Sequence, residues 1–362
     1  MFKINHAILH VFDFVSCVNV FSQDELDIAD KNVKSYVARI AKHALGGIDN
    51  KRGEFADDSL FVPELAAYLR GERSFTDLSV QIAQFLGEEL GREDDPTSCD
   101  LLVVDFEDAP KPPRAEPGED GEVDPQAQAA LDAAYADRSA RYFGMLLLES
   151  RPAFMHEVGR AEDGAVRNSI ERHHAILPSP SQKIASFALI DVRTMAVQFV
   201  DKERTIAGEQ RWLLPEGLLQ CSMEASSKES FDTAMRLVEE VAEEYGANSA
   251  VAMGRAKAYL AENAADSDEV PFDELANEAF SDDAPRRRLS EAAAEEQLPE
   301  RMVVERSVAQ RVARNHKIRT DTGIEVTFPA EYSQNPDFIE FTSAPNGLIQ
   351  IELKNIGHIE NR

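Results

Sequence analysis

The most concentrated positive charge of this chain lies between Arg301 and Arg319, where six Lys or Arg residues stand against a single acid, Glu305. Cations of this kind neutralise phosphate groups, and a cluster of them is typical of a surface that binds nucleic acid. Arg311 and Arg314 are three residues apart, so on a helix they would project from the same side. The candidate DNA-binding residues are Arg306, Arg311, Arg314, Lys317 and Arg319.

The same cations could instead be neutralised within the protein. Three acids, Glu295, Glu296 and Glu300, come shortly before them, and the whole chain has 66 Asp and Glu against 38 Lys and Arg, a net charge of −28. A molecule with this balance repels DNA at long range, so a contact with DNA must be local and sensitive to salt. The sequence leaves both interpretations open, phosphate-binding cations or internal ion pairs.

Two further groups contain residue types that could do chemistry. His173 and His174 are adjacent, and adjacent side chains on a strand point to opposite faces, so a shared metal would need ligands from elsewhere. We interpret them as surface or packed histidines. The triple Arg286–Arg288 follows Asp282 and Asp283, which favours an ion-paired, hinge-like loop over a phosphate contact.

The chain contains none of the common enzyme motifs. Both glycine spacings of phosphate-binding loops are absent, as are the Gly-x-Ser-x-Gly elbow and the His-Glu-x-x-His helix. The three cysteines, Cys17, Cys99 and Cys221, are far apart and form no Cys-x-x-Cys pair, which argues against a disulfide framework or a cysteine zinc site. We expect reduced core cysteines, no catalytic activity, no metal and no cofactor.

The length of 362 residues predicts two domains, because one hydrophobic core rarely grows past about 250 to 300 residues. No apolar run approaches the roughly 20 residues that a membrane-spanning helix needs. The first residues lack the basic flank, apolar run and cleavage site of a signal peptide. We therefore expect a cytoplasmic protein that has no membrane partner.

The N-terminal domain, residues 1–215, is predicted to be an antiparallel sheet with flanking helices. Strands are expected where apolar and β-branched residues run together, and helices where apolar residues recur at helical spacing behind a capping residue. The expected strands or hairpins are 2–20, 100–106, 142–148, 153–158, 184–192 and 195–200, and the expected helices are 30–44, 61–69 and 74–86.

Two segments of this domain are expected to lie outside the sheet. Residues 107–138 are rich in Pro, Gly and acids, and they predict a solvated insertion. The insertion would lie in the loop between 100–106 and 142–148, which we expect to pair, with 153–158 as the hairpin partner of the second of these strands. Residues 172–183 contain two prolines and predict a loop.

The C-terminal domain, residues 216–362, is predicted to be a helical segment that ends in a small antiparallel sheet, after a linker-like stretch at 217–222. The whole chain is therefore of the α+β class. Asn346-Gly347 is the clearest hairpin signal. The expected helices are 227–245, 249–260, 271–280, 289–298 and a short one from Ser307, and the expected strands are 323–328, 337–341, 348–353 and 356–359.

The chain opens with Ile4-Asn-His-Ala-Ile-Leu-His10 followed by Leu26-Asp27, and it closes with Gly323–Pro329, Glu331-Tyr332, Phe338–Phe341 and Leu348–Gly357. These two ends resemble the bacterial nucleoid-associated proteins of the NdpA type. The resemblance covers nearly the whole chain apart from the insertion at 107–138. It implies association with the nucleoid, by binding DNA directly or through a partner protein, and no enzymatic activity.

The leading hypothesis is a non-enzymatic homodimer at the nucleoid that contacts DNA phosphates through its C-terminal cations. The alternative is an acidic protein-interaction module that a basic partner recruits to the nucleoid, or a mimic of DNA charge. It predicts that the purified protein does not shift DNA. A third hypothesis, an enzyme that uses His173 or His174, predicts a bound metal or a cleft around them.

Overall fold

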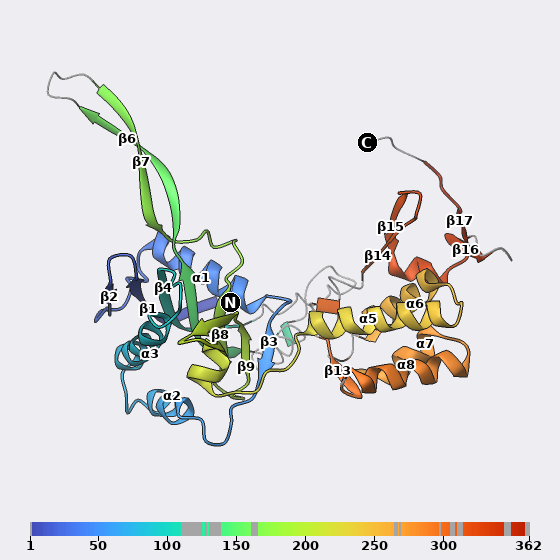
Figure 1. Cartoon of the computed structure of the whole chain (residues 1–362), viewed down its shortest axis with the longest axis horizontal. Helices are drawn as coiled ribbons and strands as arrows, with labels where there is room; N and C mark the ends of the chain where they lie inside the picture. The colour runs from blue at the N-terminus through green and yellow to red at the C-terminus, as the bar shows by residue number, and fades with distance from the viewer. Residues whose placement is uncertain are drawn as a thin grey trace. The chain divides into compact units, whose positions relative to one another are not determined.

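The structure, a computed structural model, describes most of the chain, and its residues form two compact units, Met1–Glu224 and Ala225–Arg362 (Figure 1). The domain boundary expected from the sequence lies earlier, after residue 215, and almost all of the predicted insertion at 107–138 falls outside the described residues. The described residues are 2–109, 125–126, 129, 139–160, 166–263, 267, 269–296, 298–304, 308–309, 314–343 and 349–358.

A seven-stranded antiparallel sheet forms the centre of the first unit, in the order β2-β1-β4-β5-β8-β9-β3. The first eight residues of the interior strand β4 are all buried, because both faces of the sheet are covered. This confirms the predicted sheet and the pairing of 100–106 with 142–148. The strands are β1 (Phe2–Asp13), β2 (Val18–Val20), β3 (Lys51–Gly53), β4 (Cys99–Asp108), β5 (Ala140–Glu149), β8 (Ser186–Asp191) and β9 (Val197–Val200).

Three helices cover this sheet, and all three were predicted. Helix α1 (Lys31–Leu45) packs Val37 and Ile40 on one face of the sheet, in a core with Leu102 and Leu146. Helices α2 (Phe61–Leu69) and α3 (Phe75–Leu90) pack on the opposite face. The Asp30 side chain caps α1 and the Ser74 side chain caps α3, each by accepting hydrogen bonds from backbone N–H groups of the first turn.

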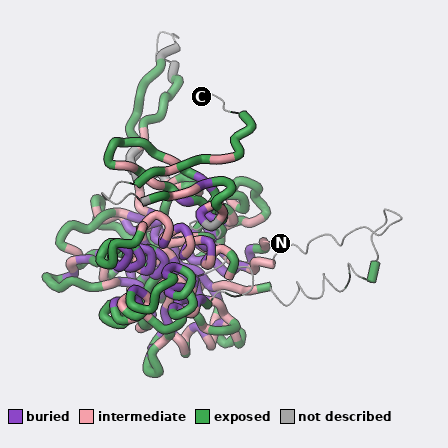
Figure 2. Tube along the Cα trace, turned by 90° about the vertical axis from the view of Figure 1, so that its right-hand side faces the viewer, coloured by how far each residue is buried: buried purple, intermediate pink, exposed green. Residues whose placement is uncertain are grey.

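A separate hairpin joins β6 (Arg151–Arg160) to β7 (Val166–Ile176). The predicted pairing of 153–158 with 142–148 is wrong, because β4 and β8 already occupy the two edges of β5. The predicted loop at 172–183 also starts too early, since its first residues belong to β7. The hairpin extends away from the sheet of its unit, and its described side chains are largely exposed (Figures 1 and 2).

The first unit ends with a hairpin, β10 (Glu203–Ile206) and β11 (Glu209–Trp212), and a π-helical turn over Leu213–Leu219. Leu213, Leu214 and Leu219 of this turn are buried in the same core as α2 and α3. The stretch at 217–222 therefore differs from the expected linker, because its leucine side packs against the core.

The second unit is a group of helices around one apolar core, formed by α5 (Ser227–Glu244), α6 (Ser249–Asn263), α7 (Phe272–Ala279) and α8 (Asp283–Glu295). Ser226 caps α5 in a capping box with Glu229, one residue before the predicted cap. The predicted break at 282–288 is wrong, because α8 begins there. Pro285 falls in the first turn of α8, where a missing N–H removes no helical hydrogen bond.

Short antiparallel strands close the second unit, as predicted. β14 (Asn315–Arg319) pairs with β15 (Glu325–Pro329), a 3₁₀ turn follows at Ala330–Gln334, and β16 (Ile339–Ser343) pairs with β17 (Ile349–Leu353). β12 (Glu269–Pro271) also pairs with β13 (Arg301–Val303).

Three sequence predictions near this end have different outcomes. The predicted turn Asn346-Gly347 and the capping residues Ser307 and Gln310 lie outside the described residues. The strand expected at 356–359 is absent from its described part, 356–358. None of the described helices is both long and apolar enough to cross a membrane.

Candidate nucleic-acid interface

Strand β14 carries two of the predicted DNA-binding residues, Lys317 and Arg319, and Arg314 directly precedes it. Side chains alternate between the faces of a strand, so Lys317 and Arg319 share one face, and both are exposed. Arg314 is exposed as well. Arg306 and Arg311 lie outside the described residues. The structure therefore places three of the five candidate cations on one exposed stretch of chain.

The opposite face of β14 is buried and fixes the ribbon to its unit. His316 is 1% exposed, and its ring lies 5.4 Å from the ring of Phe328, its partner on β15. Burial, with the nearby charge of Lys257, lowers the pKa of His316 to about 4, so the ring is neutral at pH 7. His316 is therefore a packing residue that turns the neighbouring cations outward.

A close contact between α6 and the 3₁₀ turn also positions this ribbon. Gly254 of α6 faces Ser333, and a Cβ atom at Gly254 would lie 2.4 Å from the Ser333 Oγ atom. Only a residue without a side chain allows the two elements to approach so closely. The strand β14 that carries the cations thus rests on a helix rather than standing free.

Acidic residues reduce the positive charge of this face. The Lys317 Nζ atom lies 2.9 Å from Glu325 Oε2, with the two side chains 61% and 47% exposed. Glu325 is also the residue directly opposite Arg319 in the β14–β15 register. Arg314 and Arg319 form no ion pair with any residue that the structure describes. An exposed ion pair of this kind is worth about 0.2 to 1 kcal/mol, so an anionic ligand can compete for Lys317.

Two of the three acids expected to neutralise the cluster, Glu295 and Glu296, contact other arginines. Glu295 lies 3.4 Å from Arg288 of its own helix, and Glu296 lies 2.9 Å from Arg236 of α5. These carboxylates are therefore engaged by arginines on the surface of the helices of the second unit. Within the described part of the chain, the one acid that pairs with a candidate cation is Glu325.

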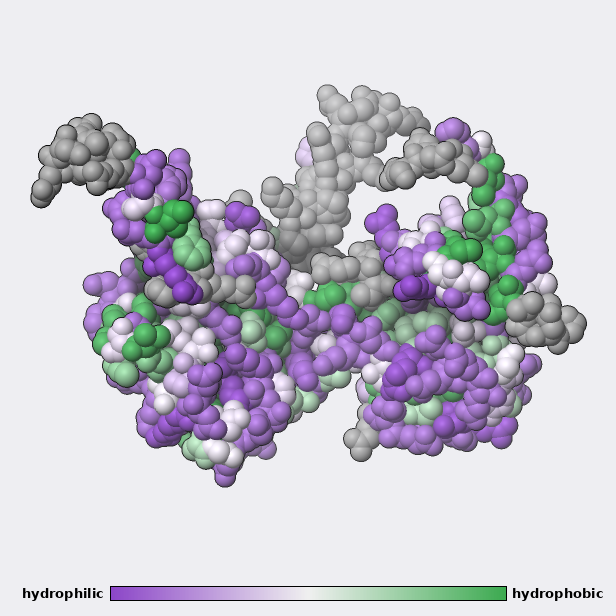
Figure 3. Space-filling model, turned by 45° about the horizontal axis from the view of Figure 1, so that its top comes forward, coloured by the Kyte–Doolittle hydropathy of each residue, from purple (hydrophilic) through white to green (hydrophobic). Residues whose placement is uncertain are grey.

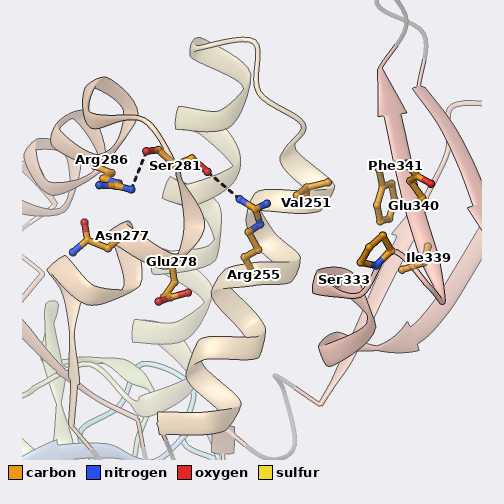
Figure 4. A pocket seen from close by; sticks show the side chains of 11 residues that line it. Val251, Arg255, Asn277, Glu278, Ser281, Arg286, Ser333, Ile339, Glu340 and Phe341 are labelled. Atoms are coloured by element: carbon orange, nitrogen blue, oxygen red, sulfur yellow. Dashed lines mark hydrogen bonds between the residues drawn. The ribbon is translucent and has the colours of Figure 1, made fainter.

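Two arginines line a cavity of the second unit that the sequence does not indicate (Figure 4). Arg286 donates to the Ser281 carbonyl oxygen at 2.9 Å, and Arg255 donates to the Ser281 hydroxyl at 3.4 Å. Glu278 and Glu340 line the same cavity, so its charge is balanced. The arginine triple at 286–288 was predicted to be ion-paired, and Arg286 and Arg288 are, though on a helix. Arg255 gave no sequence signal because it lies among alanines.

A family model described as NA37, nucleoid-associated protein YejK, matches residues 8–359, nearly the whole chain. The chain belongs to this family. The match confirms the resemblance drawn from the two ends of the sequence, and it gives the protein a nucleoid-associated role. No curated protein matches the chain.

The NA37 chain also has a buried charged cluster in its first unit, around Asp105 of β4. Arg141 Nη2 and the Tyr68 hydroxyl each donate to Asp105 Oδ2 at 2.6 Å, and Asn5 donates to Oδ1 at 2.9 Å. These hydrogen bonds hold the pKa of Asp105 below its ordinary value despite its burial. Since every partner is satisfied, the cluster joins β1, α2, β4 and β5 rather than forming a reactive site.

The remaining candidates from the sequence are the histidine pair and the cysteines. His173 and His174 lie on β7, but their side chains are outside the described residues. Among the residues that are described, no three His, Cys, Asp or Glu side chains are grouped to hold a metal. Cys99 is buried, which raises the pKa of its thiol to about 12, whereas Cys17 is exposed and not in the core as expected.

Proposed function

We propose that this member of the NA37 family is a non-enzymatic protein of the cytoplasm and nucleoid that binds DNA directly. Arg314, Lys317 and Arg319 would contact phosphates, with Arg306 and Arg311 on the same segment. The observation that carries the proposal is the exposed face of β14, where alternation turns two cations outward and a buried His316 fixes the strand. Arg314 and Arg319 have no competing ion pair within the described residues.

The binding is expected to be weak and steeply dependent on salt. Each phosphate contact releases about 0.9 counterion, so five contacts would lower the affinity roughly 500-fold between 50 and 200 mM salt. The net charge of −28 adds a repulsion that the cluster has to overcome. A homodimer would double the number of contacts, and we therefore propose that the DNA-binding form is dimeric.

A mobility-shift titration with duplex DNA at low salt tests the proposal. The double variant Arg314→Glu and Arg319→Glu is expected to lose at least 90% of the shifted DNA at the protein concentration that half-saturates the natural chain. The matched control is Lys34→Glu and Arg39→Glu on the exposed side of α1, which changes the net charge equally. Equal binding by the first variant and the natural chain would remove the site assignment.

A second function is favoured by the ion pair between Lys317 and Glu325 and by the acidic balance of the chain. In this alternative the protein is an acidic interaction module that reaches the nucleoid by docking on a basic, DNA-bound protein. It predicts no shift of DNA by the purified chain at any salt concentration. It also predicts salt-sensitive retention of the chain on an immobilised basic DNA-binding protein.

A further inference from the structure

The two sides of the β6–β7 hairpin differ in the charge of their side chains. Residues that face each other across the two strands share a side, and the register pairs Phe154 with Arg172, His156 with Ile170 and Val158 with Asn168. All six are exposed. Among its described side chains, this side, called the acid-free face, contains three apolar residues and no carboxylate. It consists of Phe154, His156, Val158, Asn168, Ile170 and Arg172.

The other side of the hairpin has the opposite character. Met155 pairs with Glu171, and Glu157 pairs with Ser169, so both described acids of the hairpin lie there. An acid-free surface is notable in a chain of net charge −28, because most of its surface repels a second copy. The two sides of the hairpin therefore differ in how strongly they repel a second copy of the acidic chain.

The apolar residues of the acid-free face are largely exposed to solvent. Phe154 is 73% exposed and Ile170 is 77% exposed, and Val158 is also exposed, at 61%. Figure 3 shows hydrophobic residues among hydrophilic ones on this hairpin. Isolated two-stranded hairpins are marginally stable in water, and contiguous exposed apolar residues usually mark an interaction site.

We propose that the acid-free face binds the same face of a second copy, so that two hairpins stack with their chains running in opposite directions. A two-fold axis across the hairpin puts Phe154 over Val158 and Ile170 over Ile170. It also puts Arg172 over Asn168, so the two arginines do not meet and each guanidinium finds an amide oxygen. The inference rests on the homodimer of the proposed function and names its interface.

The charge of the chain selects this orientation. The hairpin extends from the first unit (Figure 1). Stacking in the same direction would bring the two acidic first units side by side, whereas stacking in opposite directions keeps them at the two ends of the stack. Stable dimers bury about 800 Å² per copy, more than three side chains offer, so we expect a dissociation constant in the micromolar range.

Sedimentation equilibrium of the full-length chain without DNA tests the interface separately from DNA binding. The natural chain is expected to show a concentration-dependent monomer–dimer equilibrium. Ile170→Ser should weaken the dimer at least tenfold, and Phe154→Ser with Ile170→Ser at least a hundredfold. Met155→Ser on the other face of the same hairpin is the matched control and should leave the equilibrium unchanged. Far-UV circular dichroism checks that each variant is folded.

The orientation has a test of its own at Asn168. Asn168→Asp should tighten the dimer by placing a carboxylate against Arg172 of the second copy, while Asn168→Arg should weaken it. Ser169→Arg, on the other face, is the control. A natural chain that stays monomeric at 1 mM, roughly a thousandfold above a micromolar dissociation constant, overturns the proposal. Equal effects of Met155→Ser and Ile170→Ser also overturn it. A natural chain that dimerises but does not bind DNA would instead contradict the proposed function alone.

Discussion

Two antiparallel ribbons of this molecule, β14–β15 and β6–β7, have similar sequence patterns and different surroundings. In β14–β15, one side of the ribbon is buried, with His316 and Phe328 in contact, and the other side carries Lys317, Arg319 and Glu325 in the open. In β6–β7 the described residues of both sides are largely exposed. In β14–β15, alternating side chains lie on a buried side and an exposed side. In β6–β7, alternating side chains lie on an acid-free side and an acidic side. The same period of two therefore predicts a strand but not what covers it.

The largest expected difference between the ribbons is in stability. Phe328→Ala should lower the free energy of unfolding of the second unit by about 3 kcal/mol, because Phe328 is 8% exposed and its removal leaves a cavity. Phe154→Ala in β6 should change the free energy of unfolding by less than about 0.5 kcal/mol, since its ring is in solvent in the monomer. Urea unfolding followed by far-UV circular dichroism measures both. Similar changes in the free energy of unfolding for Phe328→Ala and Phe154→Ala would contradict the difference between the two ribbons.

Acidification should also strongly lower the stability of the second unit through His316 on the buried side of the β14–β15 ribbon. Burial lowers the pKa of His316 to about 4, below its ordinary value of 6.5. The unfolded chain then binds the proton more readily, so stability is complete above pH 6.5 and is lost as the pH falls towards 4. The full loss is about 3 kcal/mol in the second unit. Urea midpoints measured between pH 7 and 4 should show it, and His316→Leu should remove it.

The first unit provides an internal control for this pH dependence. Burial lowers the pKa of His10 to about 4 as well, but it raises the pKa of Asp100 to about 6. Protonation of Asp100 in the folded chain stabilises the first unit as the pH falls from 6 towards the ordinary pKa of an aspartate. This gain in stability offsets the loss that His10 causes. The single tryptophan, Trp212, reports on the first unit by fluorescence. The urea midpoint measured by Trp212 fluorescence should therefore fall less steeply with pH than the midpoint measured by far-UV circular dichroism. An equally steep fall would contradict the expected difference between the two units.

A small effect on stability is also expected on the exposed side of β14. Glu325→Gln removes the ion pair with Lys317, and because both side chains are more than 40% exposed, the free energy of unfolding should change by less than about 1 kcal/mol. DNA affinity at low salt should nevertheless rise about tenfold, because one repulsive charge is removed and one cation is freed. Fluorescence anisotropy of labelled DNA measures this change. Glu331→Gln, on the neighbouring turn, is the control.

The elements with local signals could be predicted from the sequence. Asp30 and Ser74 have capping side chains at the correct spacing, and the helices that follow begin there. α8 was misplaced because Pro285 indicates a break, although in the first turn of a helix it does no harm. The segment of β6 was assigned to the main sheet because a strand pattern does not specify its partner, and the end of β7 was assigned to a loop.

The candidate site was predictable in part. The charge cluster identified the segment that ends at Arg319, and strand alternation explains its exposure. The sequence could not show that Glu325 lies opposite Arg319 and pairs with Lys317, since this depends on the register set by the turn at 320–324. It also could not show that His316 is buried, because nothing local indicates which face of β14 meets α6.

The π-helical turn at Leu213–Leu219 has a consequence for dividing the molecule into separate polypeptides. Leu219 is fully buried, and the Gln220 side chain accepts a hydrogen bond from the Leu60 backbone N–H at 2.7 Å, just before α2. A fragment that stops at residue 215 would leave α2 without this support and expose apolar surface to solvent. A fragment that stops at residue 224 keeps every one of these contacts, and α5 can begin its own chain with Ser226 as its first cap.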